Sequence, residues 1–178
     1  MDTDIGIYLN LLLNGLSLSV IFDNFNITNG IDGVNYYAMV HQSKWNCWVH
    51  SIGMLFTFYG ISCWFPALLP ITRYDRNKLQ LYTWFLYFIH YLTIDIYGAL
   101  LFVIIYSASM YFAYNRVYYE YDDVRLFFHG ILISTLSLLF QEFVGHYWGG
   151  DDPSRMTVYD ISNAVFYAPL FSVNHFMK

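Results

Sequence analysis

Three polar residues between positions 41 and 50, His41, Asn46 and His50, have the types and spacing of a metal site. Neutral imidazole is a ligand for iron, zinc and copper. In one continuous helix, a separation of nine residues would place the two histidines on opposite faces. A turn around residues 42–44, followed by a helix start, would bring both rings together. Asn46 precedes His50 by one helical turn, so its side chain could hydrogen-bond a ligating imidazole and fix its tautomer.

A second group of polar residues, Gln141, Glu142 and His146, lies far downstream. In an α-helix Glu142 and His146 are one turn apart and share a face. An ionisable residue within an apolar helix indicates function, so we expect Glu142 to contact a metal or a metal-bound histidine. Gly145 removes a side chain beside His146, which allows another helix or a ligand to approach closely. We expect Gln141, like the upstream asparagine, to support ligands rather than to bind the metal.

The other titratable residues add fewer candidates. His90 is a candidate additional ligand, whereas His129 and His175 are expected to be structural. Asp151 and Asp152 lie in a glycine-containing loop and are expected to aid solubility, although a carboxylate ligand could come from there. The sequence has no Ser-His-Asp order, Walker loop, HExxH or GxGxxG pattern, so the common hydrolase and nucleotide-binding chemistries lack their residues.

The composition of the chain indicates a membrane protein. Of its 178 residues, 57% are hydrophobic and 12% are charged, and the charged share is about half that of soluble domains. The net charge of -5 and the lack of a basic stripe argue against nucleic acid as a partner. Cys47 and Cys63 form no CxxC pair or disulfide framework, so both are expected to pack as small apolar residues.

A helix of about 20 apolar residues crosses the hydrocarbon core of a membrane, and the sequence contains several such stretches. We predict an all-α, polytopic membrane bundle of about five to six transmembrane helices. The clearest spans are Val49–Ile71, Val124–His146 and Val158–Phe176, and the polar runs that separate spans are 73–78, 115–123 and 149–153. Pro66 and Pro70 are expected to kink or end the first span.

The segment from Leu79 to Tyr114 allows two interpretations. It could form one long tilted helix, or a hairpin of two short helices at about Leu79–Thr93 and Gly98–Tyr114. An aspartate in the middle of a lipid-exposed helix costs about 2.5–3.5 kcal/mol. The hairpin moves Asp95 to the membrane interface, so we predict the hairpin.

The first 35 residues are interpreted as an N-terminal extension, and residues 36–178 as the membrane-embedded domain. Ile5–Phe22 is apolar, but Asp2 and Asp4 precede it where a cleavable signal would carry basic residues. We therefore expect an uncleaved or interfacial helix there. The glycosylation sequon at Asn26 would face the lumen if Ile5–Phe22 crosses the membrane.

The order of the helices determines which histidines can meet. If the span beginning at Val49 runs from side A of the membrane to side B, the hairpin and the following span bring His50, His90 and His146 to side A. The segment that carries His41 precedes the same face. A single span over residues 79–114 would instead place His146 opposite His50. Most lysines and arginines fall on side B, which the positive-inside rule makes cytosolic.

These motifs together resemble those of a known family. The motifs are Tyr37-x3-His41-x4-Asn46-x3-His50-Ser-Ile, then Phe143-Val-Gly-His146, then Pro153, then Ala168-Pro-Leu-Phe171. Over about residues 36–176 they resemble the small endoplasmic-reticulum 2-hydroxy fatty acid dioxygenases. The resemblance implies a polytopic protein of the endoplasmic reticulum or another organelle membrane that uses Fe²⁺ and O₂ to shorten a 2-hydroxy fatty acid by one carbon. It implies His41, His50 and His146 as metal ligands and catalytic residues.

The sequence also departs from the family pattern. The glutamine expected four residues before the last of these histidines is Glu142 here, with Gln141 beside it. The glutamate expected shortly after that histidine is absent or shifted to Asp151, and an Asp-Asn pair is reduced to Asp160 and Asn163. These departures favour a rival hypothesis, a non-catalytic membrane subunit that kept the helical scaffold and packs in a larger assembly.

In the leading hypothesis, the acyl chain of the substrate lies between helices and enters from the lipid. Lys44 or Arg155, both on side A, could pair with the substrate carboxylate. A channel or transporter is less well supported, because the sequence shows neither repeated halves nor a charge-lined helix.

Overall fold

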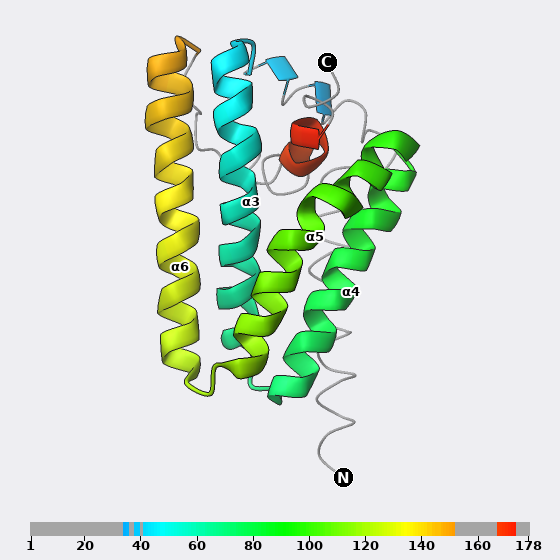
Figure 1. Ribbon diagram of the computed structural model, residues 1–178, viewed down its shortest axis with the longest axis vertical. Helices are drawn as coiled ribbons and strands as arrows, with labels where there is room; N and C mark the ends of the chain where they lie inside the picture. The colour runs from blue at the N-terminus through cyan, green and yellow to red at the C-terminus, as the bar shows by residue number, and fades with distance from the viewer. Residues whose placement is uncertain (1–33, 36–37, 40, 152–166, 174–178) are drawn as a thin grey trace.

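The computed structural model describes residues 34–35, 38–39, 41–151 and 167–173, and this part of the chain contains helices and short connections but no strand (Figure 1). The elements are α3 (Lys44–Ala67), α4 (Arg73–Leu92), α5 (Ile96–Tyr119), α6 (Asp123–Phe140) and the π-helix η2 (Gln141–Tyr147), which continues α6. Residues 167–173 form a further helical segment. The all-α prediction is therefore confirmed for this part. The predicted helix Ile5–Phe22 and most of Val158–Phe176 lie outside the described residues.

Each long helix begins at a side chain that accepts hydrogen bonds from its first backbone N–H groups. Ser43 and Thr72 cap α3 and α4 through their hydroxyls, and Asp95 and Asp122 cap α5 and α6 through their carboxylates. Such caps satisfy donors that the first turn leaves unpaired, so the helices include polar residues beyond the apolar pattern. The predicted separators are accordingly too long. Residues 73–78 lie inside α4, and α5 continues to residue 119.

The predicted hairpin is confirmed, but its two helices are not short. α4 has 20 residues and α5 has 24, and Asp95 lies at the turn between them. The four long helices therefore alternate in direction (Figure 1). The start of α3, the end of α6 and segment 167–173 meet at one end of the bundle, at the top of Figure 1. We call this the histidine end. The opposite end, where α4 and α6 begin, is called the arginine end.

α3 and α6 run side by side along their length and approach closely where they carry small residues (Figure 1). A Cβ atom added to Gly60 would lie 2.7 Å from the Gly130 carbonyl oxygen, and one added to Gly130 would lie 2.6 Å from the Trp64 nitrogen. Real Cβ atoms do not approach backbone so closely, so glycine is required at both positions. Towards the histidine end, Ser137 donates a hydrogen bond of 2.6 Å to the Gly53 carbonyl. Close contact through small residues is also how membrane helices associate.

A core of aromatic and aliphatic side chains fills the space between α3, α4, α5 and segment 167–173. Its largest fully buried members are Tyr91, Phe102, Tyr106 and Leu170. Phe102 and Tyr106 stack with ring centroids 4.9 Å apart. This core packs α5 against α3, α4 and segment 167–173, and α6 contributes no residue to it.

The outward surface of α6 and η2 is apolar. Its exposed side chains include Val124, Phe128, Leu132, Leu136, Leu139 and Phe143. Among the described helices, Ile96–Tyr119 and Asp123–Tyr147 are long and apolar enough to cross a membrane. Soluble proteins seldom expose so continuous an apolar surface, so this surface fits contact with lipid or with another protein.

Candidate metal centre

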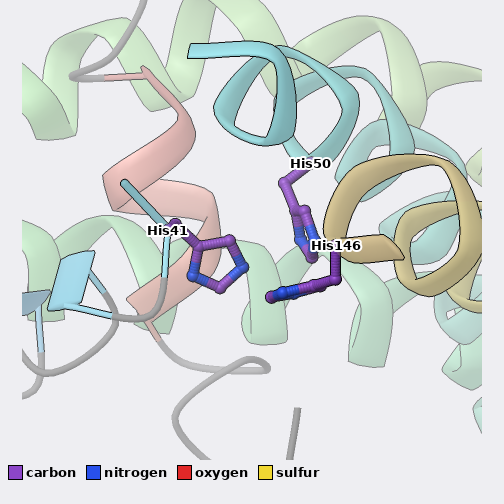
Figure 2. Close-up of side chains that lie close together, drawn as sticks. All are labelled: His41, His50 and His146. Carbon is purple, nitrogen blue, oxygen red and sulfur yellow. The ribbon is translucent and has the colours of Figure 1, made fainter. Parts of the chain in front are cut away.

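Three imidazole rings from distant parts of the sequence meet at the histidine end. Figure 2 shows His41, His50 and His146 facing one another, each from a different segment. The ring centroid of His41 lies 4.2 Å from that of His50 and 4.8 Å from that of His146, and the last two lie 4.9 Å apart. All three side chains are buried, and their candidate ligand nitrogens lie within 4.8 Å of one another. The three histidines are thus close enough together to bind one metal ion.

The convergence of the first two histidines follows from where α3 begins. His41 precedes the helix, and the Ser43 hydroxyl caps it by accepting from the Asn46 N–H at 3.3 Å. His50 lies within the helix, so the bend before Lys44 turns the His41 ring back towards His50. The predicted turn around residues 42–44 and the helix start after it are confirmed.

The third histidine is positioned by the π-helix η2. A π-helix forms i→i+5 hydrogen bonds, so residues five apart lie on nearly the same face. Gln141 and His146 are five apart, and both are buried against α3, with exposed fractions of 2% and 1%. Glu142 is only partly buried and does not belong to the histidine group. The expected pairing of Glu142 with His146 assumed α-helical spacing, and the wider turn of η2 replaces Glu142 with Gln141.

Gly145 lets α3 and η2 come into contact at the centre. A Cβ atom there would lie 2.5 Å from Asn46 Oδ1 and 3.3 Å from His50 Nε2. Any side chain at this position would push η2 away from α3 and move His146 with it. The expected close approach beside His146 is therefore found, and the approaching group is α3 itself.

Two buried amides contact the histidines, as the sequence analysis expected for Asn46 and Gln141. Asn46 is fully buried, and its Nδ2 lies 3.5 Å from Nδ1 of His146. Gln141 is hydrogen-bonded to His50. Its amide nitrogen donates to Thr57 Oγ1 at 3.0 Å and to the Ser137 carbonyl at 3.2 Å. The Gln141 carbonyl oxygen is thus the atom that remains to accept a hydrogen bond from an N–H of the His50 ring.

The hydrogen bonds of Gln141 connect the centre to the α3–α6 contact. Thr57 donates to Ser137 Oγ at 3.0 Å, and Ser137 in turn donates to the Gly53 carbonyl. A Cβ atom on Gly53 would lie 2.5 Å from Gln141 Cγ, so the glutamine side chain lies directly over that glycine. Because these partners are buried, the network holds Gln141, and through it His50, in one orientation.

The other candidate residues lie apart from this group. His90, near the end of α4, is buried with its ring centroid 6.0 Å from that of Tyr167, and it does not belong to the group of three. His129 lies on α6, where its Nε2 is 2.9 Å from the Tyr59 hydroxyl, which agrees with a structural role. Lys44 is exposed at the histidine end. Arg155, Asp152 and His175 lie outside the described residues.

The donor set fits a metal ion. Nε2 of His146 is buried and has no hydrogen-bond partner in the described part of the chain. Leaving a buried polar atom unsatisfied costs about 1–3 kcal/mol, and a metal bond would remove that penalty. Three imidazoles with no carboxylate among them suit iron, zinc or copper.

Sequence reasoning missed the role of Asp151, which was expected to aid solubility or to supply a ligand. Its carboxylate lies against the start of α3, where it accepts from Asn46 Nδ2 at 2.7 Å and from the Ser43 N–H at 3.0 Å. The only signal in the sequence is that Asp151 follows two glycines after His146.

Comparison of the chain with models of protein families, with curated proteins and with solved structures finds no match.

Proposed function

We propose that this chain is an integral membrane Fe²⁺-dependent dioxygenase that shortens 2-hydroxy fatty acids by one carbon. The observation that supports a metal centre is the convergence of three buried imidazoles from three segments. The choice of iron and of a 2-hydroxy acid rests on the resemblance of the motifs around His41, His50 and His146 to the 2-hydroxy fatty acid dioxygenases. The same resemblance suggests the endoplasmic reticulum or another organelle membrane.

The surface of the bundle supports the membrane location. Two of the described helices are long and apolar enough to cross a membrane, and the second, Asp123–Tyr147, has only 22% of its most apolar window buried. Phe128, Phe143 and Tyr147 point outward with exposed fractions of 63%, 63% and 79%. Lipid around α6 and η2 would cover this surface, and His146 would face the opposite direction, towards α3. In this proposal, the acyl chain of the substrate lies between helices and enters from the lipid.

In this proposal, His41, His50 and His146 hold the ion. Fe²⁺ held by these three imidazoles would supply redox chemistry with O₂. Gln141 would keep the His50 ring oriented, and the Asn46 amide nitrogen lies 3.5 Å from Nδ1 of His146. Burial of the three rings excludes bulk water from the reaction. Lys44, exposed at the same end, is a candidate partner for the substrate carboxylate.

The proposal is tested with the full-length chain in lipid nanodiscs, loaded with Fe²⁺ without oxygen. Addition of 2-hydroxypalmitate and O₂ should yield products one carbon shorter, measured by mass spectrometry. The His41→Ala variant should yield none, whereas His129→Ala should retain turnover because His129 lies outside the centre. Equal turnover in wild type and His41→Ala would reject the assignment.

The same experiment separates the enzyme from the non-catalytic subunit. A subunit would show no turnover even when one iron per chain is bound, and it would copurify with other membrane proteins in fixed stoichiometry. Turnover by the isolated chain would exclude that role as its sole function.

A further inference from the structure

The loop that follows η2 returns to the start of α3. Gly150 has a φ of 76°, in the left-handed region that favours glycine, and its N–H donates to the His146 carbonyl at 3.0 Å. A Cβ atom on Gly149 would lie 3.2 Å from Asn46 Cβ and 3.4 Å from Ser43 Oγ. The two glycines thus let the chain turn back tightly, and they place Asp151 over the first turn of α3.

Both oxygens of the Asp151 carboxylate are already engaged by donors from α3 and the residues before it. Oδ2 accepts from the Gln42 N–H at 3.2 Å, the Ser43 N–H at 3.0 Å and Asn46 Nδ2 at 2.7 Å. Oδ1 lies 3.2 Å from the Ser43 nitrogen. Asp151 is also absent from the group of residues close enough to share an ion. Its carboxylate therefore binds backbone and amide donors, not metal.

The residues that Asp151 contacts lie next to the ligands. Gln42 directly follows His41, and Asn46 contacts His146. One carboxylate thus connects the segment carrying His41, the first turn of α3 and the loop that follows His146. Hydrogen bonds to a charged group are stronger than neutral ones, and a helix N-terminus favours a negative charge.

We propose that Asp151 is the positioning residue that assembles the centre, holding His41 and His146 in register with α3. This inference rests on the proposed metal centre. Without the carboxylate, the backbone N–H groups of Gln42 and Ser43 lose their three hydrogen bonds to Asp151. The neighbouring His41 ring is then no longer held against the rings of His50 and His146. Residues that orient metal ligands typically contribute 10–100-fold to metal affinity.

The test uses purified full-length chain in nanodiscs, titrated with Co²⁺ as a spectroscopic probe. Asp151→Asn should raise the Co²⁺ Kd about 10–100-fold. The matched control is Asp122→Asn, because Asp122 also accepts from two backbone N–H groups at a helix start, but at the arginine end. This control should leave the Co²⁺ Kd and the absorption bands unchanged. Asp151→Glu, which keeps the charge on a longer side chain, should fall between wild type and Asp151→Asn.

A second measurement needs no metal. Cys47 is buried and its thiol donates to the His41 carbonyl at 3.2 Å. Because the charge of Asp151 also acts on this thiol, N-ethylmaleimide labelling is measured over a range of pH and compared at equal thiolate fraction, so that the rate reports opening of this segment. In metal-free protein, Asp151→Asn should accelerate labelling of Cys47 about tenfold or more, as expected from loss of a charge-assisted hydrogen bond. Asp122→Asn should not. Peptide mass spectrometry separates Cys47 from Cys63.

The two measurements distinguish the possible failures. Wild-type Kd and wild-type Cys47 labelling in Asp151→Asn would overturn the positioning role while leaving the metal centre intact. Faster labelling in Asp151→Asn, with no Co²⁺ bound by the wild type, would support the positioning role and reject the metal centre.

Discussion

The two ends of the helix bundle differ in how their polar groups are paired. At the arginine end, cations meet anions or aromatic rings: Arg76 pairs with Asp123, Arg116 lies 2.9 Å from Glu120, and Arg73 lies 4.1 Å from the Tyr121 ring centroid. At the histidine end, three imidazoles face one another, and the nearby carboxylate contacts N–H donors instead.

This difference indicates which end is built for stability and which for binding. At the arginine end, charged groups pair within the chain, and Thr72 and Asp122 cap the starts of α4 and α6. The histidine end gathers three imidazoles close enough to share a metal ion, and Nε2 of His146 has no hydrogen-bond partner in the described part of the chain. Variants at the two ends should therefore separate stability from metal affinity, and variants between them should affect both.

The largest expected effect is the loss of metal from His146→Ala. Removing one of three ligands should lower metal affinity by more than about 100-fold, beyond the effect of an orienting residue. Metal content per chain, measured by mass spectrometry after desalting, should fall to background. His129→Ala, which removes the imidazole bound to Tyr59, is the control and should retain the wild-type metal content.

The next effect is expected at the close contact between the two ends. Gly130→Val forces a side chain against the Trp64 backbone and the Gly60 carbonyl. We expect destabilisation of about 1–3 kcal/mol from overpacking, together with weaker metal binding, because the register of α6 sets the position of η2. Thermal unfolding and Co²⁺ titration measure the two effects. Thr135→Val, on the exposed side of α6, should change neither.

Gln141→Leu should weaken metal binding about tenfold, because the His50 ring loses the amide that orients it. Gln80→Leu is a matched control, since Gln80 is also a buried amide and donates to the Ser62 carbonyl at 2.6 Å. Both variants should lower the Tm, but only Gln141→Leu should raise the Co²⁺ Kd. Equal Kd values in the two variants would contradict the role assigned to Gln141.

The smallest effect is expected from Asp123→Asn at the arginine end. The Asp123 side chain is 50% exposed, so solvent screens its pairing with Arg76 and the loss should be no more than about 1 kcal/mol. A Tm decrease with an unchanged Co²⁺ Kd would sharpen the distinction between the ends. A changed Kd would show that the two ends are coupled.

Much of the fold could be predicted because its determinants are local. The cost of an aspartate in lipid favoured a turn at Asp95, and the number of helix reversals then placed His50 and His146 at the same end. Helix boundaries were less accurate, because the hydroxyl of Thr72 and the carboxylate of Asp122 extend helices into polar sequence. The periodicity of apolar residues does not reveal such capping side chains.

The candidate site could be predicted only in part. The three histidines were found from residue type and helix order. The choice between Glu142 and Gln141 depended on a change from α to π geometry within one helix, and tertiary contact with Gly53 and Asn46 accompanies that change. The place of Asp151 depended on a turn through Gly150, which sequence spacing does not reveal.

The π-helix makes the centre sensitive to chain length as well as to residue identity. A π segment amounts to an α-helix that accommodates an added residue. Relaxation of the segment to α geometry with its length unchanged would place His146 five α-helical residues after Gln141. Each residue of an α-helix turns by about 100°, so the imidazole would then lie about 140° around the helix from Gln141 and point away from its partners. Deletion of one residue between Gln141 and His146 would instead leave four α-helical residues, which turn by about 400° and keep the imidazole on the face of Gln141.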